Sequence, residues 1–246
     1  MRAFLAARTY DTITFLVRWA GRLFARLEVV GTENVPAEGP VVLICNHSHL
    51  VDPPLVGSLS PRDVHTMAKR ELFETPLIGW IFWAVGAFPV RRFSGDLGAL
   101  RVARNYLRDG RVVLMYPEGT RNHGRGLKPA LPGAAMVALL ANAPVVPVAI
   151  EGSHAIRWRS IFFRWLIGRR PPIRIVFGEP FALDRADVSA QSALEATDMI
   201  MRRVAALLSP RYRGAYGDES KGTVVVARAT PDQRARFEAE RRGSRE

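Results

Sequence analysis

The chain has 246 residues, with 35 Lys and Arg against 23 Asp and Glu, and its net charge is +12. This length allows a full core, so one large α/β domain is expected. The positive charge indicates an anionic partner, such as nucleic acid, an anionic membrane face or a phosphorylated substrate. Cys45 is the only cysteine, which excludes an internal disulfide and fits a reducing compartment. No apolar run approaches the roughly 20 residues that span a bilayer, and the N-terminus lacks a signal-peptide pattern.

Residues 3–27 have the pattern of an amphipathic helix. Phe15 and Trp19 lie beside a basic stripe on the face opposite the apolar one. The helix either packs on the core with a solvated basic face or lies in a membrane interface, and we favour the interface because aromatics on a charged face have no core to enter. The stripe consists of Arg18, Arg22 and Arg26, and the apolar face of Ile13, Leu16, Val17, Ala20, Leu23, Phe24 and Leu27.

Beyond Gly31, strand-like and helical patterns alternate along the chain. This alternation predicts an α/β fold with a mostly parallel central sheet flanked by helices on both faces. The predicted strands are 41–45, 64–68, 112–116, 145–150 and 173–177, and the predicted helices are 53–59, 96–108, 133–142 and 190–208.

Two further apolar segments are unusual for a fully buried position. Segment 76–90 contains Trp80, Phe82 and Trp83, for which core packing is the alternative. Segment 156–170 alternates bulky aromatics with arginine, which suits an anionic lipid interface better than a core. We therefore expect three parts, an interfacial helix at 1–27, a main domain at 28–209, and a polar, loosely attached tail at 210–246. The tail contains a possible strand at 223–227 and a helix after Pro231.

His47 and Asp52 are the first candidate site residues. His47 follows the predicted strand 41–45, and ligand sites in α/β proteins gather where such strands end. Asp52 precedes Pro53, which suits a helix N-cap, and the loop between can fold its carboxylate onto the imidazole as base and orienter. Two alternatives remain, a helix cap beside a polar loop histidine, or a metal cluster with His49. We expect no metal, because no second group of ligands accompanies this one.

A second candidate group follows the predicted strand 112–116. Gly119 allows the backbone to approach a ligand closely, and Thr120 and Arg121 can donate hydrogen bonds to a phosphate. Glu118 can accept from a substrate hydroxyl or pair with an arginine. A third group, residues 86–92, ends a short extended run with two arginines.

In this order and at matching strand ends, these motifs resemble the lysophosphatidic acid acyltransferases and their glycerolipid acyltransferase relatives. The resemblance covers about residues 27–180, and its four blocks are 46–52, 86–92, 117–121 and 145–148. It implies an α/β fold with His47 as general base and Asp52 as its partner. The residues that it places around the acceptor phosphate are Arg92, Glu118, Gly119, Thr120 and Arg121.

The chain departs from the family pattern in two places. Pro89 stands where a phenylalanine is often found, with Phe88 one place earlier. Leu131 stands where the family's basic-Pro-Gly segment often has a basic residue, within a segment that begins at Lys128.

The expected reaction moves an acyl group from a thioester to the sn-2 hydroxyl of lysophosphatidic acid, giving phosphatidic acid. Acyl-CoA or acyl carrier protein serves as co-substrate, and no cofactor is expected. Another lysophospholipid or glycerol-3-phosphate is the alternative acceptor. A non-enzymatic nucleic-acid-binding protein is disfavoured because lysine is scarce and no recognition motif is present. The expected location is peripheral or monotopic on the cytoplasmic face of the cell membrane.

Overall fold

A seven-stranded sheet forms the centre of the protein, in the order β1-β7-β6-β2-β5-β3-β4. The computed structural model describes residues 2–91, 96–157, 159–184, 188–218, 222 and 224. All neighbouring strands are parallel except β6 and β7, which confirms the mostly parallel sheet. The strands are β1 (Arg26–Val30), β2 (Val41–Cys45), β3 (Val64–Lys69), β4 (Phe88–Val90), β5 (Val112–Met115), β6 (Val145–Glu151) and β7 (Pro172–Phe177).

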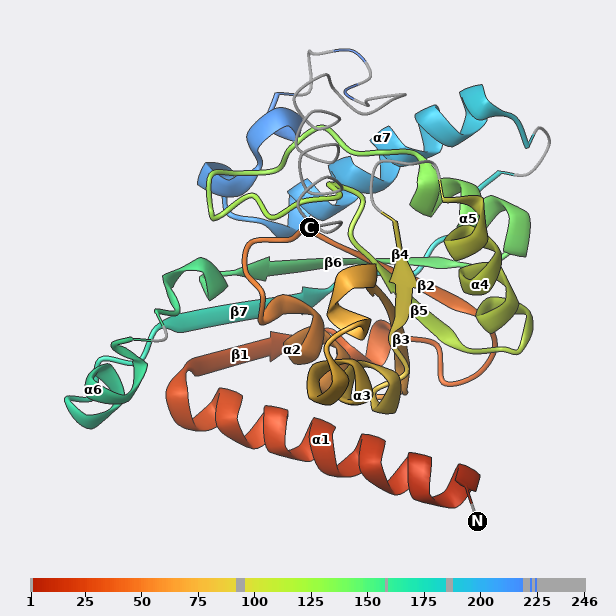
Figure 1. Ribbon diagram of the computed structural model, residues 1–246. Coiled ribbons are helices and arrows are strands. Elements are labelled where there is room, and N and C mark those ends of the chain that lie inside the picture. The colour runs from red at the N-terminus through yellow and green to blue at the C-terminus, as the bar shows by residue number, and fades with distance from the viewer. Residues whose placement is uncertain are drawn as a thin grey trace, which may run out of the picture.

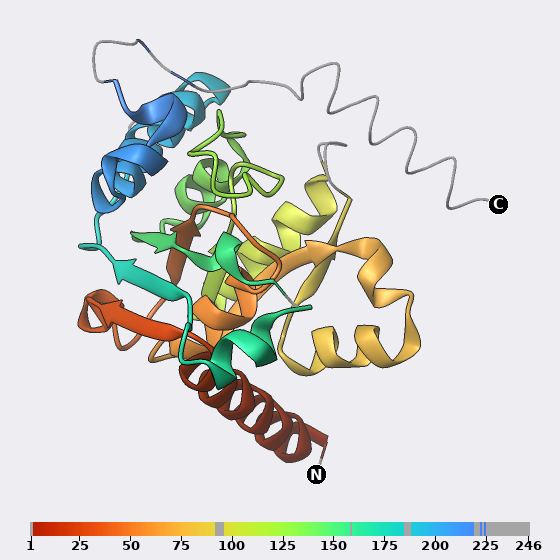
Figure 2. The ribbon, with the colours of Figure 1, turned by 90° about the vertical axis from the view of Figure 1, so that its left-hand side faces the viewer.

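Helices cover both faces of the sheet (Figures 1 and 2). In Figure 1 one group lies below the sheet, namely α1 (Arg2–Phe24), α2 (Asp52–Leu59) and α3 (Pro76–Ala84). The other group consists of α4 (Leu97–Arg108), α5 (Gly133–Ala141) and α7 (Ala190–Leu207), with α7 above the sheet and α4 and α5 toward its right-hand side. The short helix α6 (Ile161–Leu166) projects beyond the end of the sheet.

Strand β2 is buried on both faces, as its continuous apolar sequence predicts. Val41, Leu43 and Cys45 belong to the core cluster that includes α2. Val42 and Ile44 belong to the opposite cluster, with α4, α5 and α7. The strand that leads into the candidate site is therefore fixed from both sides.

The predicted N-terminal helix is too long by three residues. Helix α1 ends at Phe24, and Arg26–Val30 forms the edge strand β1, paired with β7. The pairing partner lies about 145 residues away in sequence, so helical spacing across 3–27 could not reveal it. Two positions also differ from the predicted faces. Leu16 is exposed, and Arg18 turns toward the domain, where its Nε donates to Ser58 O at 2.8 Å.

The first residues of the predicted tail pack against the domain. The Tyr216 hydroxyl accepts from Ala130 N at 3.0 Å, and Tyr212 O accepts from Leu127 N at 3.0 Å. Tyr216 is 3 % exposed. The predicted strand at 223–227, apart from Val224, and the helix after Pro231 lie outside the described residues.

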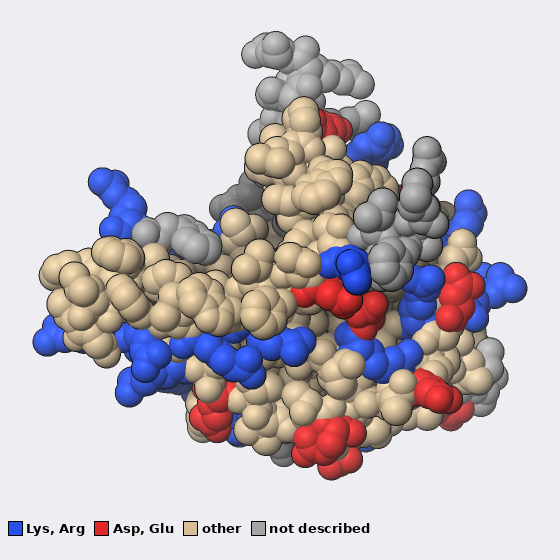
Figure 3. Space-filling model, turned by 90° about the horizontal axis from the view of Figure 1, so that it is seen from below, with Lys and Arg blue, Asp and Glu red and all other residues tan. Residues whose placement is uncertain are grey.

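Helices α1, α3 and α6 carry large apolar side chains that are more than half exposed. Seen from below, uncharged side chains cover a broad area beside a band of Lys and Arg (Figure 3). Helix α1 contacts both α3 and α6, so the three helices form one surface. We call its exposed apolar residues the apolar rim, which consists of Phe15, Leu16, Trp19, Leu77, Trp80, Trp83, Phe162, Phe163 and Leu166. Among the residues described, no helix is long and apolar enough to cross a membrane.

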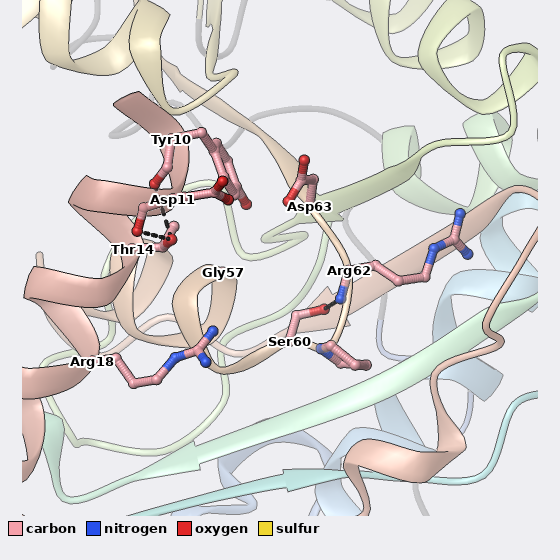
Figure 4. Close-up of a pocket in the computed structure, with 9 residues that line it drawn as sticks. Tyr10, Asp11, Thr14, Arg18, Gly57, Ser60, Arg62 and Asp63 are labelled. Carbon is pink, nitrogen blue, oxygen red and sulfur yellow. Dashed lines mark hydrogen bonds between the residues drawn. The ribbon is translucent and has the colours of Figure 1, made fainter. Parts of the chain in front are cut away.

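Polar contacts hold α1 on the domain around a pocket of about 190 Å³ (Figure 4). The pocket lies between α1 and the segment that joins α2 to β3, and its lining includes Tyr10, Arg18 and Asp63. The Tyr10 hydroxyl accepts from Val64 N at 2.8 Å, and burial raises the pKa of Tyr10 to about 12. None of the predicted site residues that the structure describes lines this pocket, which lies where α1 packs on the domain.

Gly31 and Gly39 provide a matched pair for testing the junction between β1 and β7. Both have φ of +77°, but a Cβ on Gly31 would lie 2.0 Å from Phe177 O, whereas one on Gly39 would meet nothing within 4 Å. We expect Gly39→Ala to lower the free energy of unfolding by about 1 kcal/mol, through backbone strain alone. Gly31→Ala should lower it by about 3 kcal/mol or more, because the clash adds to that strain. Urea denaturation measures both, and equal losses would contradict the close approach.

Candidate active site

The structure brings His47 and Asp52 together at the end of β2. Strands β5 and β6 run parallel to β2, so their carboxyl ends meet at this same edge of the sheet. Asp52 is fully buried, and its Oδ2 lies 3.0 Å from His47 Nδ1. The same oxygen accepts from the backbone N–H of Ser48 at 2.6 Å and of His49 at 2.7 Å. The N-cap of α2 is Val51 and the Asp52 side chain does not cap the helix, so the helix-cap alternative is wrong.

The hydrogen bond to Asp52 defines the tautomer of His47. Because Nδ1 donates to the carboxylate, the neutral ring carries its lone pair on Nε2. Nε2 forms no hydrogen bond with any described residue, and the side chain keeps a small exposed fraction. The Tyr116 ring packs on the imidazole with centroids 4.5 Å apart. Asp52 and Tyr116 together fix the orientation of the imidazole ring.

Glu118 fastens the loop after β5 to the loop after β2. Its carboxylate is fully buried and accepts from His47 N at 2.8 Å and from Lys128 N at 2.9 Å. The Asn122 amide donates to both carboxylate oxygens, at 3.1 and 3.2 Å. Burial raises the pKa of Glu118 to about 7, against the lowering effect of these donors. The carboxylate thus faces protein donors, and the substrate contact that the resemblance implies stays a prediction.

Asn122 is a residue that the sequence reasoning missed. It is 3 % exposed, and its backbone N–H donates to His47 O at 2.7 Å. Its Oδ1 accepts from Ser48 Oγ at 3.1 Å and from Gly124 N at 2.9 Å. In the sequence, the only feature that marked Asn122 as a site residue was its position directly after the 117–121 block. Asn122 and Glu118 together hold His47 at both its N–H and its C=O.

The remaining residues of the 117–121 block lie on the loop after β5, which Glu118 joins to His47. Gly119 has φ of +66°, and its N–H closes a turn onto Tyr116 O at 3.1 Å. Thr120 is half-buried and Arg121 is exposed. Burial is the main cause of the lowered pKa of His49; the Asp52 charge opposes the lowering, and the Arg121 charge adds to it.

The second arginine-bearing block is only partly described. Arg92 lies in the stretch 92–95, outside the described residues. Arg91 is exposed, and its backbone N–H donates to Asp96 Oδ2 at 2.9 Å, next to the N-terminus of α4. The structure therefore does not test the prediction for Arg92.

The metal-cluster alternative finds no support in the geometry around His47. Within the part of the chain that the structure describes, no three His, Cys, Asp or Glu side chains are grouped to hold a metal ion. His47 and Asp52 instead bond to each other. Independence from metal stays a prediction.

Comparison with known proteins identifies the family. Residues 26–151, half of the chain, match the acyltransferase family. The chain is 30 % identical over 181 residues to the 1-acyl-sn-glycerol-3-phosphate acyltransferase of Bacillus subtilis, covering 72 % of this chain and 86 % of that one. This chain belongs to the acyltransferase family. The four motif blocks of the sequence are therefore those of an acyltransferase.

Two further comparisons extend this result. The acyltransferase is 32 % identical over 195 residues to a lyso-ornithine lipid O-acyltransferase of Pseudomonas aeruginosa, covering 71 % of this chain and 73 % of that one. Its fold matches the crystal structure of the 1-acyl-sn-glycerophosphate acyltransferase PlsC from Thermotoga maritima, with a TM-score of 0.65. That match has 24 % identity and covers 84 % of this chain and 83 % of the other.

The raised pKa of Glu118 predicts a pH dependence of folding stability. In the folded chain Glu118 holds its proton up to about pH 7, whereas a carboxyl with the ordinary pKa of 4.5 loses it earlier in the unfolded chain. The unfolded state therefore binds fewer protons in this window, and the free energy of unfolding falls as the pH rises through it. Relative to Glu118→Gln, the wild type should lose thermal stability between about pH 5 and about pH 8.

Melting temperatures of both proteins at each pH test this. The matched control is Glu179→Gln, at an exposed carboxylate, which should follow the wild-type profile. Parallel profiles for Glu118→Gln and the wild type would show that burial does not hold the Glu118 proton.

Proposed function

We propose that this acyltransferase moves a fatty acyl group from a thioester donor to the sn-2 hydroxyl of lysophosphatidic acid, giving phosphatidic acid. The observation that carries the proposal is the His47–Asp52 pair at the end of β2, whose imidazole Nε2 forms no hydrogen bond with any described residue. The substrate named for the Bacillus subtilis relative supports the choice of acceptor.

The proposed step is general-base catalysis by His47. Nε2 takes the proton of the acceptor hydroxyl as its oxygen attacks the thioester carbonyl. Asp52 holds the tautomer and stabilises the imidazolium. When the tetrahedral intermediate collapses, the carbon–sulfur bond breaks and the thiolate takes the proton from His47. The step needs no cofactor, and acyl-CoA or acyl carrier protein supplies the thioester.

The acceptor phosphate is proposed to lie against the 117–121 block. Arg121 supplies a guanidinium that pairs well with phosphate oxygens, and Thr120 supplies a hydroxyl. Arg92 is the other proposed guanidinium, on the resemblance alone. Binding the headgroup in this way would hold the sn-2 hydroxyl in reach of Nε2, which converts the transfer into a positioned reaction.

A second acceptor is worth testing because the chain is also similar to a lyso-ornithine lipid acyltransferase. Purified protein in liposomes, assayed with acyl-CoA and acyl carrier protein donors against lysophosphatidic acid, other lysophospholipids, glycerol-3-phosphate and lyso-ornithine lipid, decides donor and acceptor together. Preference for lysophosphatidic acid supports the proposal, and activity on another acceptor alone would replace it.

We expect His47→Ala and Asp52→Asn each to lower kcat by roughly 100- to 10,000-fold, the usual contribution of a positioned general base. Both variants should keep a wild-type melting profile. In Asp52→Asn the amide oxygen can still accept the backbone hydrogen bonds of Ser48 and His49. Steady-state kinetics and thermal melting check this. A folded variant with near wild-type turnover would rule out the proposed roles.

We also propose that the apolar rim faces a membrane, so that the enzyme is peripheral or monotopic on the cytoplasmic face of the cell membrane. None of the nine rim residues belongs to either core cluster. Exposed arginines lie close by in the sequence of α1 and α6, among them Arg22, Arg157 and Arg169. Lipid burial of large apolar groups and attraction to anionic headgroups, about 1 kcal/mol for each arginine, act together. An acceptor drawn from the bilayer also avoids exposing its chain to water, which costs about 0.8 kcal/mol per CH₂.

The triple variant Trp19→Ala, Trp80→Ala, Phe162→Ala should reduce the partition of the protein onto anionic vesicles by at least roughly tenfold, because each side chain contributes about 1.5–3 kcal/mol when buried. A matched control is Leu140→Ala with Met199→Ala, at apolar residues exposed on the opposite helix layer. Sedimentation with vesicles measures the partition. High salt should weaken the attachment of the wild-type protein to the vesicles but not abolish it. Wild type that stays in the supernatant at low salt, or equal loss in the control, would refute the membrane-facing surface.

A further inference from the structure

Two polar atoms next to His47 are buried without a hydrogen-bond partner. One is Asp52 Oδ1, although Oδ2 of the same carboxylate bonds to the His47 ring and to two backbone N–H groups. The other is the hydroxyl oxygen of Tyr116, whose ring packs on the His47 imidazole with centroids 4.5 Å apart. Leaving a buried acceptor or donor unpartnered is costly, and most of all for a carboxylate. The two atoms therefore mark a connection behind the imidazole that the direct hydrogen bonds do not supply.

The Tyr116 hydroxyl is a donor, which is what Asp52 Oδ1 lacks. The side chain packs against the core cluster that contains Cys45 and α2. Burial raises the pKa of Tyr116 well above its usual value, and Cys45 and the charge of Asp52 add to the rise. The hydroxyl therefore keeps its proton at every working pH and lies within electrostatic range of the carboxylate. A protonated phenol can donate, and the carboxylate oxygen can only accept.

Packing on the imidazole requires only the ring of Tyr116. A phenylalanine at this position would bring the same apolar contacts and no hydroxyl into the interior. Burying a hydroxyl without a partner is unfavourable, so the oxygen is expected to have a use at this place. Buried water molecules in proteins characteristically bond to polar groups that are otherwise unsatisfied, and one water can join a donor and an acceptor that do not touch.

We propose that Tyr116 is a positioning residue of the His47–Asp52 pair, whose hydroxyl donates through one buried water to Asp52 Oδ1. The role of His47 as base rests on the proposed function, but the effect of Tyr116 on the protonation of the ring does not. With donors on both oxygens, Asp52 is held against rotation and stays ionised beside the imidazolium. Oδ2 then orients the ring while Oδ1 is held from the side of the core.

Tyr116→Phe removes the hydroxyl and keeps the ring. The pair carries a net negative charge when His47 is neutral and none when it is protonated, so a donor to Asp52 favours the neutral ring. Its removal should move the protonation of His47 to higher pH by about 0.5–1 pH unit, the size expected for one hydrogen bond. The acid limb of the kcat/KM profile should move with it, which lowers kcat/KM roughly three- to tenfold below the limb. Tyr10→Phe is the matched control, since the Tyr10 hydroxyl is bonded to Val64 N beside α1, and it should leave the profile unchanged.

NMR titration of the His47 ring measures the shift without any substrate. The His47 signal is assigned by its loss in His47→Gln. The other titratable or charged groups near the pair are retained in both Tyr116→Phe and the wild type, so a difference between the two titrations reports the hydroxyl. These groups are Cys45, His49, Glu118, Arg121 and His123.

A double-mutant cycle tests whether the effect passes through Asp52. In an Asp52→Asn background, Tyr116→Phe should move the His47 titration by less than about 0.2 pH unit, because the amide carries no charge. An equal shift in both backgrounds, or identical His47 titrations in the wild type and Tyr116→Phe, would overturn the inference. A fall in melting temperature with an unchanged titration would show that the hydroxyl serves packing alone. A shifted titration in a protein that transfers no acyl group to lysophosphatidic acid would uphold the inference and refute only the proposed function.

Discussion

One buried carboxylate joins the two loops from which the candidate site is built. Glu118 accepts hydrogen bonds from His47 N, Lys128 N and the Asn122 amide, and it has no exposed surface. A buried carboxyl group without hydrogen-bond partners is strongly unfavourable, so the N–H donors of Glu118 must be kept in place. The loops after β2 and β5 are consequently dependent on each other. A displacement of either one leaves a polar group unsatisfied in the interior.

In this arrangement the backbone and the ring of His47 are held by different residues. Glu118 and Asn122 hold the backbone through its N–H and C=O, whereas Asp52 and Tyr116 orient the ring. A functional side chain supported from all these directions has little freedom to leave its productive geometry. The same loops position Thr120 and Arg121, so the base and the candidate phosphate contacts are built as one unit.

The exposed aromatics of the apolar rim differ physically from the core. Helix α1 is held to the domain by polar contacts, Tyr10 with Val64 and Arg18 with Ser58, while Phe15 and Trp19 remain outside. In the sequence segment 156–170, which contains α6, arginine alternates with aromatics, and a core cannot satisfy so many guanidinium groups. Monomeric proteins seldom expose large contiguous apolar patches. The exposed apolar rim therefore fits an enzyme that is proposed to act on lipid.

The sequence by itself determined the sheet class, the strand before His47 and the pairing of His47 with Asp52. These features are local, since a buried parallel strand is a continuous apolar run and the two residues are separated by a single short loop. Strand β1 was missed because its partner β7 is distant in the chain, and Leu16 and Arg18 were assigned to the wrong faces because helical spacing does not show which face meets the domain. The contacts of Glu118, Asn122 and Lys128 were likewise decided only in the tertiary structure. The contacts of Glu118 and Asn122 with the loop after β2 join residues about 70 positions apart. Nothing in the order of the residues states which backbone N–H a buried carboxylate will face.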